Sequence, residues 1–333
     1  MSWPEGGIGE MSTSGLKERF RELFNAEVEV DGNYVVSLDG SSSLDQQQTN
    51  EAFSDKWETY SSSEEREGLY QFQKEWYLTL YGFPSEDELR EYLSGCQTIF
   101  DAGCGLGYKA AWLAELAPHA LVVGMDFSEA ARQAAETYTA VPNLFFVQGD
   151  IADTGFRGGL IDYVSCDQVI QHTENPEKTF AELVRISRKP KGEIACYFYA
   201  KKALPRELLD DHFRVACKQL SREELWQMSE QLTELGRRLS ELNVTIESPD
   251  IPALGIKGGK QDIQRFIYWN FLKCFWNEEL GKETSIATNY DWYSPSNARR
   301  FTEEEVHALT EKHGLKETYF HNEEACYSGR FTH

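Results

Sequence analysis

Cysteine is scarce in this chain, and its spacing suits neither of its usual structural uses. The 333 residues include seven cysteines, none before Cys96, and no two of them form a CxxC pair. This spacing excludes a zinc ribbon, and an odd number argues against a disulfide framework. We therefore expect reduced thiols and a cytoplasmic protein, and we predict no metal site.

Basic residues and long apolar runs are also under-represented. Lys and Arg together number 33 against 55 Asp and Glu, which gives a formal net charge of -22. Such an acidic surface repels phosphate backbones and anionic lipid, so we expect no nucleic-acid and no membrane partner. Solubility or a saline habitat would explain the acidity equally well. We recognise no signal peptide and no apolar run long enough to span a bilayer.

What the sequence does contain is a regular alternation of apolar strands and helices from residue 98 onward. Continuous apolar strands separated by helices indicate a parallel sheet that is covered on both faces. Two further strands near the C-terminus bring the number to seven. We therefore predict an α/β fold with a Rossmann-like, seven-stranded, mostly parallel sheet and helices on both faces. The strands are expected at residues 98–103, 120–126, 143–150, 160–167, 192–200, 315–321 and 325–331.

The rhythm of strands and helices divides the chain into four parts. Residues 1–84 are expected to form an N-terminal extension and cover, with a short hairpin within residues 28–50. Residues 85–200 would form the core of the fold, beginning with a helix capped by Ser85. Residues 201–300 are mostly helical without a clear strand, which indicates an inserted subdomain or lid. Residues 301–333 would complete the core with a helix and a hairpin.

The stretch "FDAGCGLGY" at residues 100–108 joins the first core strand to a helix. Three alternating glycines, Gly103, Gly105 and Gly107, remove Cβ atoms and allow a ligand to approach the backbone closely. Their spacing is G-x-G-x-G, whereas a dinucleotide-binding loop requires G-x-G-x-x-G or A, and Tyr108 fills the position where a small residue belongs. Asp101 would repel a pyrophosphate but could hold an ammonium group.

Further acidic residues stand at the ends of the next strands. Asp126 lies about 20 residues past the loop, where an acid accepts both hydroxyls of a ribose. Asp150 ends the third strand, near the expected position of an adenine, and Asp167 and Gln168 follow the fourth. Each alone could be a simple turn residue. Together they fit a ligand with an amino group, a ribose and an adenine but no phosphates, and S-adenosylmethionine is such a ligand.

Residues 99–200 resemble the class I S-adenosylmethionine-dependent methyltransferases. The matching segments are "FDAGCGLG", "VVGMDFS", "VQGDIAD" and the stretch from "FRGGLIDYVSCDQVIQH" to "GEIACYFY". The segment "YDWYSPSNARRFTEEEVHALTEKHGL" is similar to a subset of these enzymes. Relatives in that subset often carry an N-terminal zinc ribbon, which this chain cannot build because no cysteine precedes Cys96.

The resemblance implies a role for each residue of the cofactor site, with S-adenosylhomocysteine as the product. Asp101 and the loop would contact the methionine part, and Asp126 would hold the ribose. Asp150 and Ile151 would hold the adenine, with Phe127 against the purine. The segment "NEAFSDKW" resembles one that closes over the cofactor. The complete set of expected cofactor residues is Asp101, Gly103, Cys104, Gly105, Gly107, Asp126, Phe127, Asp150, Ile151, Asp167, Gln168, Phe53 and Trp57.

Three regions are candidates for the acceptor side. His172 follows the fourth strand and is a candidate catalytic residue, although it could equally position a loop. The segment "NYDWYSP" could orient or deprotonate an acceptor, or could simply anchor the insert. The aromatic, cationic segment at residues 254–277, with a helix expected over 261–276, could bind a carboxylate on one helix face, or could be core. These regions and the start of the insert supply the candidate catalytic residues His172, Tyr290 and Asp291, and the candidate substrate-binding residues Arg214, Arg265, Tyr268, Trp269, Lys273, Trp292 and Tyr293.

The function favoured by these patterns is methyl transfer to a small, polar, carboxylate-bearing metabolite by in-line displacement. A lid large enough to enclose a pocket suits a small acceptor better than a macromolecule. Methylation of RNA or protein, and a non-catalytic nucleoside-binding protein on the same fold, remain alternatives. A nicotinamide dehydrogenase is disfavoured by the glycine spacing and by Asp101. The N-terminal arm and the aromatic helices could also serve a homodimer.

Overall fold

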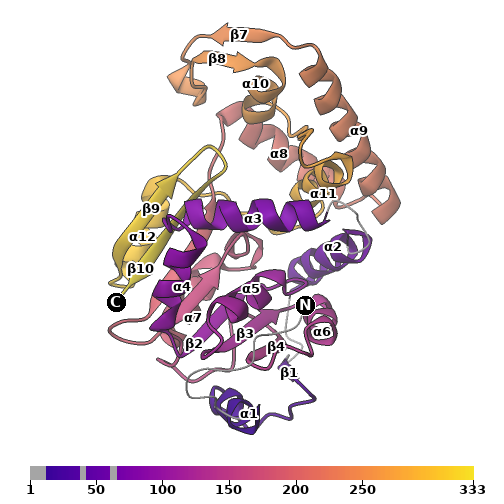
Figure 1. Cartoon of the computed structure of the whole chain (residues 1–333). Helices are drawn as coiled ribbons and strands as arrows, with labels where there is room; N and C mark the ends of the chain where they lie inside the picture. The colour runs from indigo at the N-terminus through magenta and orange to yellow at the C-terminus, as the bar shows by residue number, and fades with distance from the viewer. Residues whose placement is uncertain (1–12, 38–42, 61–65) are drawn as a thin grey trace.

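The computed structural model describes residues 13–37, 43–60 and 66–333, and within them a single large sheet dominates the fold (Figure 1). Its strand order is β1-β4-β3-β2-β5-β6-β10-β9. The first six strands in this order run parallel, whereas β10 is antiparallel to both of its neighbours. The predicted α/β class is confirmed. The strands are β1 (Tyr34–Ser37), β2 (Thr98–Ala102), β3 (Leu121–Asp126), β4 (Leu144–Gly149), β5 (Tyr163–Cys166), β6 (Glu193–Tyr199), β9 (Lys316–Asn322) and β10 (Cys326–Thr332).

The sheet has eight strands rather than the predicted seven, because β1 joins its edge. Of the hairpin expected within residues 28–50, the described residues show one antiparallel bridge, between Asp31 and Tyr34. Strand β1 itself pairs in parallel with β4, and residues 38–42 lie outside the described part. A helix that was not predicted, α1 (Thr13–Glu22), also belongs to the core, where Phe20 stacks on Phe145 at 4.7 Å between ring centroids. In each of these two contacts, β1 with β4 and Phe20 with Phe145, the partners are more than a hundred residues apart in sequence, so no local pattern predicts them.

Alternate residues of the central strands enter two separate hydrophobic clusters. Phe100, Leu121 and Phe145 belong to one, whereas Ile99 and Val122 belong to the other. This alternation places one cluster on each face of the sheet, as expected for a parallel sheet covered twice. The helix α4 begins as predicted, since the Ser85 side chain accepts a hydrogen bond from the Glu88 backbone. The helices that follow α1 in the core are α4 (Glu86–Ser94), α5 (Tyr108–Leu116), α6 (Ala130–Thr137), α7 (Pro176–Ile186) and α12 (Glu303–Lys312).

The inserted segment forms the upper part of Figure 1, with α3 (Arg66–Leu80) drawn between it and the sheet. Its helices are α8 (Leu204–Cys217), α9 (Arg222–Glu241), α10 (Ile263–Asn270) and α11 (Lys282–Tyr293). The expectation of no clear strand is wrong, because β7 (Thr245–Ser248) and β8 (Gly259–Asp262) form an antiparallel hairpin. Short 3-10 turns occur at η1 (Ile170–His172) and η2 (Pro252–Leu254), and α2 (Leu44–Tyr60) precedes α3.

The aromatic helix expected over residues 261–276 ends early, at Asn270. Beyond this residue the chain lies against α9, where a Cβ atom added to Gly236 would come 2.3 Å from the Cys274 carbonyl oxygen. The Gln264 side chain donates to the same oxygen at 2.9 Å. This tertiary contact outweighs the helical periodicity, so Lys273 does not share a helix face with Arg265. Among the helices of the described residues, none has the length and apolarity needed to cross a membrane.

Candidate functional site

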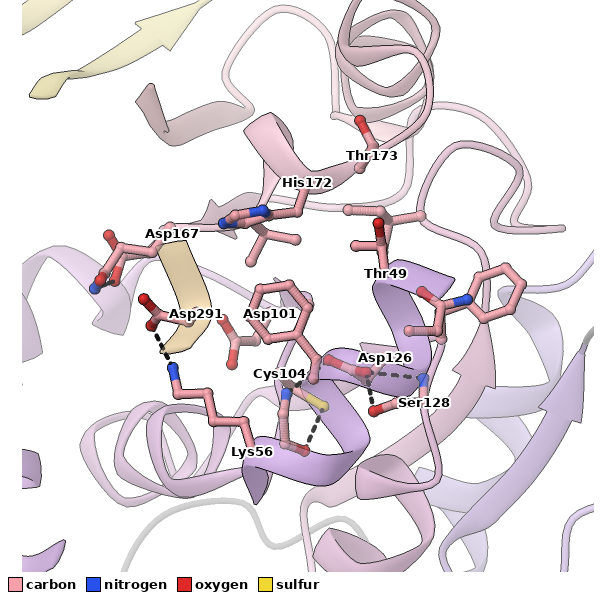
Figure 2. A pocket seen from close by; sticks show the side chains of 18 of the residues that line it. Thr49, Lys56, Asp101, Cys104, Asp126, Ser128, Asp167, His172, Thr173 and Asp291 are labelled. Atoms are coloured by element: carbon pink, nitrogen blue, oxygen red, sulfur yellow. Dashed lines mark hydrogen bonds and ion pairs between the residues drawn. The ribbon is translucent and has the colours of Figure 1, made fainter. Parts of the chain in front are cut away.

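A cavity of about 1090 Å³, including its mouth, opens at the carboxyl ends of the central strands. We call it the strand-end pocket. Figure 2 shows Asp101, Asp126, Asp167 and Asp291 arranged around it. Its lining comes from the ends of β2 to β6, from the loops after them, and from α2, α3, α5 and α11. This is the edge at which open α/β sheets bind ligands.

Neighbouring strands present three carboxylates in a defined order. Asp101, Asp126 and Asp150 stand at the ends of β2, β3 and β4, which are adjacent in the sheet. Adjacent strands lie about 4.8 Å apart, so the three carboxylates span roughly 10 Å across the sheet edge. The order from Asp150 to Asp101 matches an adenine, a ribose and an amino group in succession.

The glycine loop contributes both backbone shape and a hydrogen bond. Gly103 has φ +77, and a Cβ atom there would lie 2.4 Å from the Val169 side chain. The Gly105 backbone N–H donates to an Asp126 carboxylate oxygen at 2.9 Å. Gly107, expected at the cofactor, does not line the pocket: a Cβ atom there would meet Ala134 at 2.8 Å. Its position serves the packing of α5 against α6 instead.

Asp126 organises the loop and still faces the pocket. Besides Gly105, it accepts hydrogen bonds from the Ser128 backbone at 2.9 Å and the Ser128 hydroxyl at 2.6 Å. A carboxylate has about four acceptor sites. Three are used by the protein, so the carboxylate is held rigidly and retains capacity toward a ligand hydroxyl.

Asp101 is a buried carboxylate that lacks a complete set of partners. It is 2% exposed, and its Oδ2 atom has no hydrogen-bond partner among the described residues. Burial raises the pKa of this carboxyl to about 6, although the charge of Lys109 and the nearby Ser165 hydroxyl oppose the shift. A buried carboxylate is costly unless a cation or donors accompany it. The site therefore suits a ligand with an ammonium group.

The Asp167 carboxylate is paired with groups of the protein itself. Lys109 forms a buried ion pair with it, and the Tyr81 hydroxyl donates to it at 2.9 Å. Burial opposes the charge of Lys109, but the attraction of Asp167 outweighs burial, so the pKa of Lys109 is raised. The next residue, Gln168, has φ 64, a left-handed conformation that non-glycine residues rarely adopt. Such outliers concentrate at functional sites, and Gln168 lines the pocket.

His172 lies in η1 at the pocket wall, between the rings of Phe53 and Tyr199. The centroid separations are 4.8 Å and 5.4 Å. Its Nδ1 atom is 2.9 Å from the Asn297 carbonyl oxygen, which can only accept, so Nδ1 carries the proton and Nε2 has the lone pair. Burial lowers the pKa of His172 to about 4. The ring is therefore neutral at pH 7.

Most of the expected cofactor residues line the strand-end pocket. They are Asp101, Gly103, Cys104, Gly105, Asp126, Phe127, Asp150, Ile151, Asp167, Gln168 and Phe53. Two of the candidate catalytic residues, His172 and Asp291, line it as well. The side chain of Trp57 lies outside the described residues.

Three candidate catalytic or substrate-binding residues, Tyr290, Tyr293 and Arg214, do not line the strand-end pocket and belong to the packing of the insert. Tyr290 stacks on Trp226, with ring centroids 4.0 Å apart, in the core of the insert. The Tyr293 hydroxyl donates to buried Asp210 at 3.1 Å. The Arg214 guanidinium donates to the Trp292 carbonyl oxygen at 2.9 and 3.1 Å. Their contacts are those of structural residues that hold α8, α9 and α11 together.

A second cavity of about 1400 Å³, which we call the insert pocket, lies among α3, β6, α10 and α11. The remaining substrate-binding candidates all line it: Arg265, Tyr268, Trp269, Lys273 and Trp292. Its cationic lining consists of Lys56, Lys202, Arg206, Arg265 and Lys273, against the two carboxylates Asp291 and Glu323. In a chain of net charge -22, this is a pronounced local excess of positive charge.

Five residues line both pockets and form a shared wall: Lys56, Gln73, Gln168, Tyr199 and Asp291. Lys56 of α2 and Asp291 of α11 form an ion pair at 2.7 Å across it. Tyr199, which the sequence interpretation missed, carries the same signal as the aspartates, because it ends strand β6. Lys56 lies in the segment "NEAFSDKW", whose resemblance to a cofactor-covering segment was a signal for the region, whereas Gln73 had none, since only the fold brings α3 to the site.

No group of three or more His, Cys, Asp or Glu side chains within residues 13–37, 43–60 and 66–333 is arranged to hold a metal ion. Each of the seven cysteines is a buried free thiol.

Part of the chain is similar to a known protein family. A family described as "Methyltransferase domain" matches residues 100–196. Residues 100–196 are thus similar to a methyltransferase domain. The matched residues run from within β2 to within β6 and include the ends of β2 to β5 that line the strand-end pocket.

Curated relatives resemble the methyltransferase domain over limited stretches. Malonyl-[acyl-carrier protein] O-methyltransferase of Halalkalibacterium halodurans is 27% identical over 139 residues, 40% of this chain and 50% of that protein. Trans-aconitate 2-methyltransferase of Deinococcus radiodurans is 35% identical over 97 residues, 29% of this chain and 36% of that protein. The chain thus spans half or less of the length of these relatives.

Among solved structures, magnesium protoporphyrin IX methyltransferase of Synechocystis with bound SAM resembles this chain with a TM-score of 0.44. The sequence identity is 15%, over 88% of this chain and 97% of that one.

Proposed function

We propose that this protein transfers a methyl group from S-adenosylmethionine to a small, carboxylate-bearing metabolite. One observation carries the proposal. A pocket with the polar groups for an amino acid nucleoside shares a wall with a second pocket that is rich in cations. A donor and an acceptor can therefore meet at Tyr199, Gln168 and Asp291 without leaving the protein.

The donor would occupy the strand-end pocket. Asp101 would pair with the ammonium group, Asp126 would accept from the ribose hydroxyls, and Asp150 with Ile151 would face the adenine. The unpartnered, buried Oδ2 atom of Asp101 supports this placement, because an ammonium group supplies the missing partner. When bound, the donor supplies a methyl group on a positively charged sulfur.

The protein's own residues would position the acceptor and exclude water. Transfer would require the acceptor's nucleophilic atom to be held in line with the methyl group that the donor supplies, and Tyr199, Gln168 and Asp291 line the wall where the two would meet. The proton of that atom, if it has one, would leave to Asp291 or to solvent. His172, with a pKa of about 4, is a weak base at pH 7, so we assign it a hydrogen bond from the acceptor to Nε2.

The names of two relatives agree with a carboxylate on the acceptor, since malonyl and trans-aconitate both carry carboxyl groups. Both groups are acyclic, so this agreement concerns the charge of the acceptor and not its shape. The Lys and Arg side chains of the insert pocket could also bind a carboxylate through charge-assisted hydrogen bonds.

The proposal is tested by supplying methyl-labelled S-adenosylmethionine and extracts of small metabolites to the wild-type protein and to Asp126→Ala. We expect label in an anionic small molecule with the wild type, and at least about 100-fold less with the variant, since donor binding is lost. Label that enters only protein or RNA would contradict a small acceptor. Donor binding without any labelled product would instead indicate a non-catalytic binding protein.

Donor affinity should also depend on pH through Asp101. Its carboxyl has a pKa of about 6 in the free protein, and pairing with an ammonium group requires the ionised form. Affinity for S-adenosylhomocysteine should therefore be constant from pH 7 upward until the ligand's own amine titrates, and should fall by up to about tenfold per pH unit below 6. Calorimetric titrations from pH 5 to 7.5 measure this. A flat profile in the wild type would show that Asp101 does not pair with the ligand.

A further inference from the structure

The insert pocket has a second chemical feature besides its charge. Aromatic side chains cover much of its wall, and they come from α3, β6, the α10 region and α11. Their rings are tilted or edge-to-face rather than stacked flat: Trp76 meets Tyr197 at 77°, and Tyr268 meets Trp269 at 75°. Such a wall offers both ring faces and ring edges to a flat ligand. The aromatic residues are Phe72, Trp76, Tyr197, Tyr199, Tyr268, Trp269, Phe275 and Trp292.

Lys273 is the most unusual cation in this wall. It is 5% exposed, and its ammonium lies 4.4 Å from the centroid of the Trp292 ring and 6.0 Å from that of Tyr268. Among the described residues it has neither an ion pair nor a hydrogen bond from this ammonium. Burial accordingly lowers the pKa of Lys273 to about 7. The charges of Asp291 and Asp210 favour the protonated form of Lys273, but neither carboxylate pairs directly with its ammonium, and a ligand carboxylate would supply a direct partner.

Arg265 extends the same cationic site. Its guanidinium lies 5.6 Å from the ring centroid of Tyr268 and 5.8 Å from that of Phe275, so it shares the Tyr268 ring with Lys273. It likewise has no carboxylate partner within the described part of the chain. By contrast, Arg206 is paired with Asp210 at 2.7 Å, and Lys202 donates to three backbone carbonyl oxygens. Lys273 and Arg265 are therefore the cations left for a ligand.

The positions of these charges orient the ligand. Lys273 and Arg265 line only the insert pocket, whereas the charges of the shared wall, Lys56 and Asp291, neutralise each other at 2.7 Å. An anionic group would bind at Lys273 and Arg265, inside the insert pocket. The opposite end of the same molecule would then reach Tyr199, next to the strand-end pocket.

We propose that the insert pocket binds a flat, ring-bearing carboxylic acid, whose carboxylate pairs with Lys273 and Arg265 and whose ring packs on Trp292 and Tyr268. Resting on the proposed function, this assigns the carboxylate as the anchor of the acceptor and places the methylated group at the other end. The acceptor is thus an aromatic or similarly flat acid rather than an acyclic one.

Probe binding tests this assignment without knowledge of the natural acceptor. Tryptophan fluorescence reports on the pocket, since Trp76, Trp269 and Trp292 line it. We expect 2-naphthoate to bind the wild type at least about tenfold more tightly than its neutral analogue 2-naphthamide or acyclic succinate. Lys273→Met should weaken 2-naphthoate by at least about tenfold and leave 2-naphthamide unchanged, and Lys273→Arg should restore most of the loss.

Two controls separate the possible failures. Lys260→Gln removes an exposed lysine of β8 that lines neither pocket and should change nothing. Affinity for S-adenosylhomocysteine should be equal in all variants, and its loss in the wild type would refute the proposed function rather than this inference. Equal binding of 2-naphthoate and 2-naphthamide, binding of succinate as tight as that of 2-naphthoate, or no binding of 2-naphthoate would each overturn the inference. The wild-type comparison stands even if Lys273→Met unfolds.

Discussion

Asp101→Asn is expected to lower the affinity for S-adenosylhomocysteine by about 100-fold, a loss typical of removing one partner from a buried charge pair. The carboxylate is buried and its Oδ2 atom has no partner in the described residues, so a bound ammonium group would depend on it. Asparagine keeps the volume and removes only the charge. Isothermal calorimetry measures the effect.

The same variant should not destabilise the free protein. Burial raises the pKa of Asp101 to about 6, above its usual value, so the folded state binds more protons than the unfolded state between about pH 4 and 6. The free energy of unfolding therefore falls as pH rises through this window, and Asp101→Asn should remove that decrease. A variant that keeps full donor affinity would show that Asp101 is not at the ammonium group. A variant that is unfolded at pH 7 would contradict the burial argument.

Asp126→Ala should abolish measurable donor binding, with a loss of at least about 100-fold, because hydrogen bonds to a charged group are among the strongest. The substitution removes the expected ribose acceptor and also frees the Gly105 and Ser128 backbone groups that shape the loop. Asp153→Ala is a matched control. It deletes an exposed carboxylate that follows the same sheet edge and does not line the pocket.

Calorimetry measures the donor affinity of each variant, and thermal melting shows whether the variant is folded. Asp153→Ala should bind S-adenosylhomocysteine like the wild type. Wild-type affinity in a folded Asp126→Ala protein would contradict the assignment of the ribose to this residue.

The sequence was sufficient for the central sheet and its strand-end carboxylates. Parallel strands buried on both faces are continuous apolar runs, and their carboxyl ends meet at one edge, so Asp101, Asp126 and Asp150 could be placed together from spacing alone. Tyr199 could have been included by the same rule. The whole set lines one pocket because the strand order puts β4, β3 and β2 side by side.

The remaining features depend on contacts that no local pattern contains. Strand β1 pairs with a strand more than a hundred residues away. The hairpin of β7 and β8 is short and largely solvent-exposed, so it lacks the apolar alternation that marks a strand. The helical spacing suggested that Lys273 and Arg265 share a helix face. They meet at Tyr268 instead through a chain that leaves the helix at Asn270.

The residues of "NYDWYSP" are neighbours in sequence, but packing places some of them in the core of the insert and others at the pockets. Tyr290, Trp292 and Tyr293 belong to the core of the insert, but Trp292 also lines the insert pocket, and Asp291 lines both pockets. Consecutive residues of α11 point in different directions, and only the positions of α8 and α9 decide which face is covered.

We propose that the strand-end pocket binds an amino acid nucleoside without phosphates. Calorimetric titration of the wild-type protein with S-adenosylhomocysteine and, in parallel, with NAD measures this preference. We expect one molecule of S-adenosylhomocysteine to bind per chain and NAD to give no binding heat. Binding of NAD together with a failure to bind S-adenosylhomocysteine would contradict it.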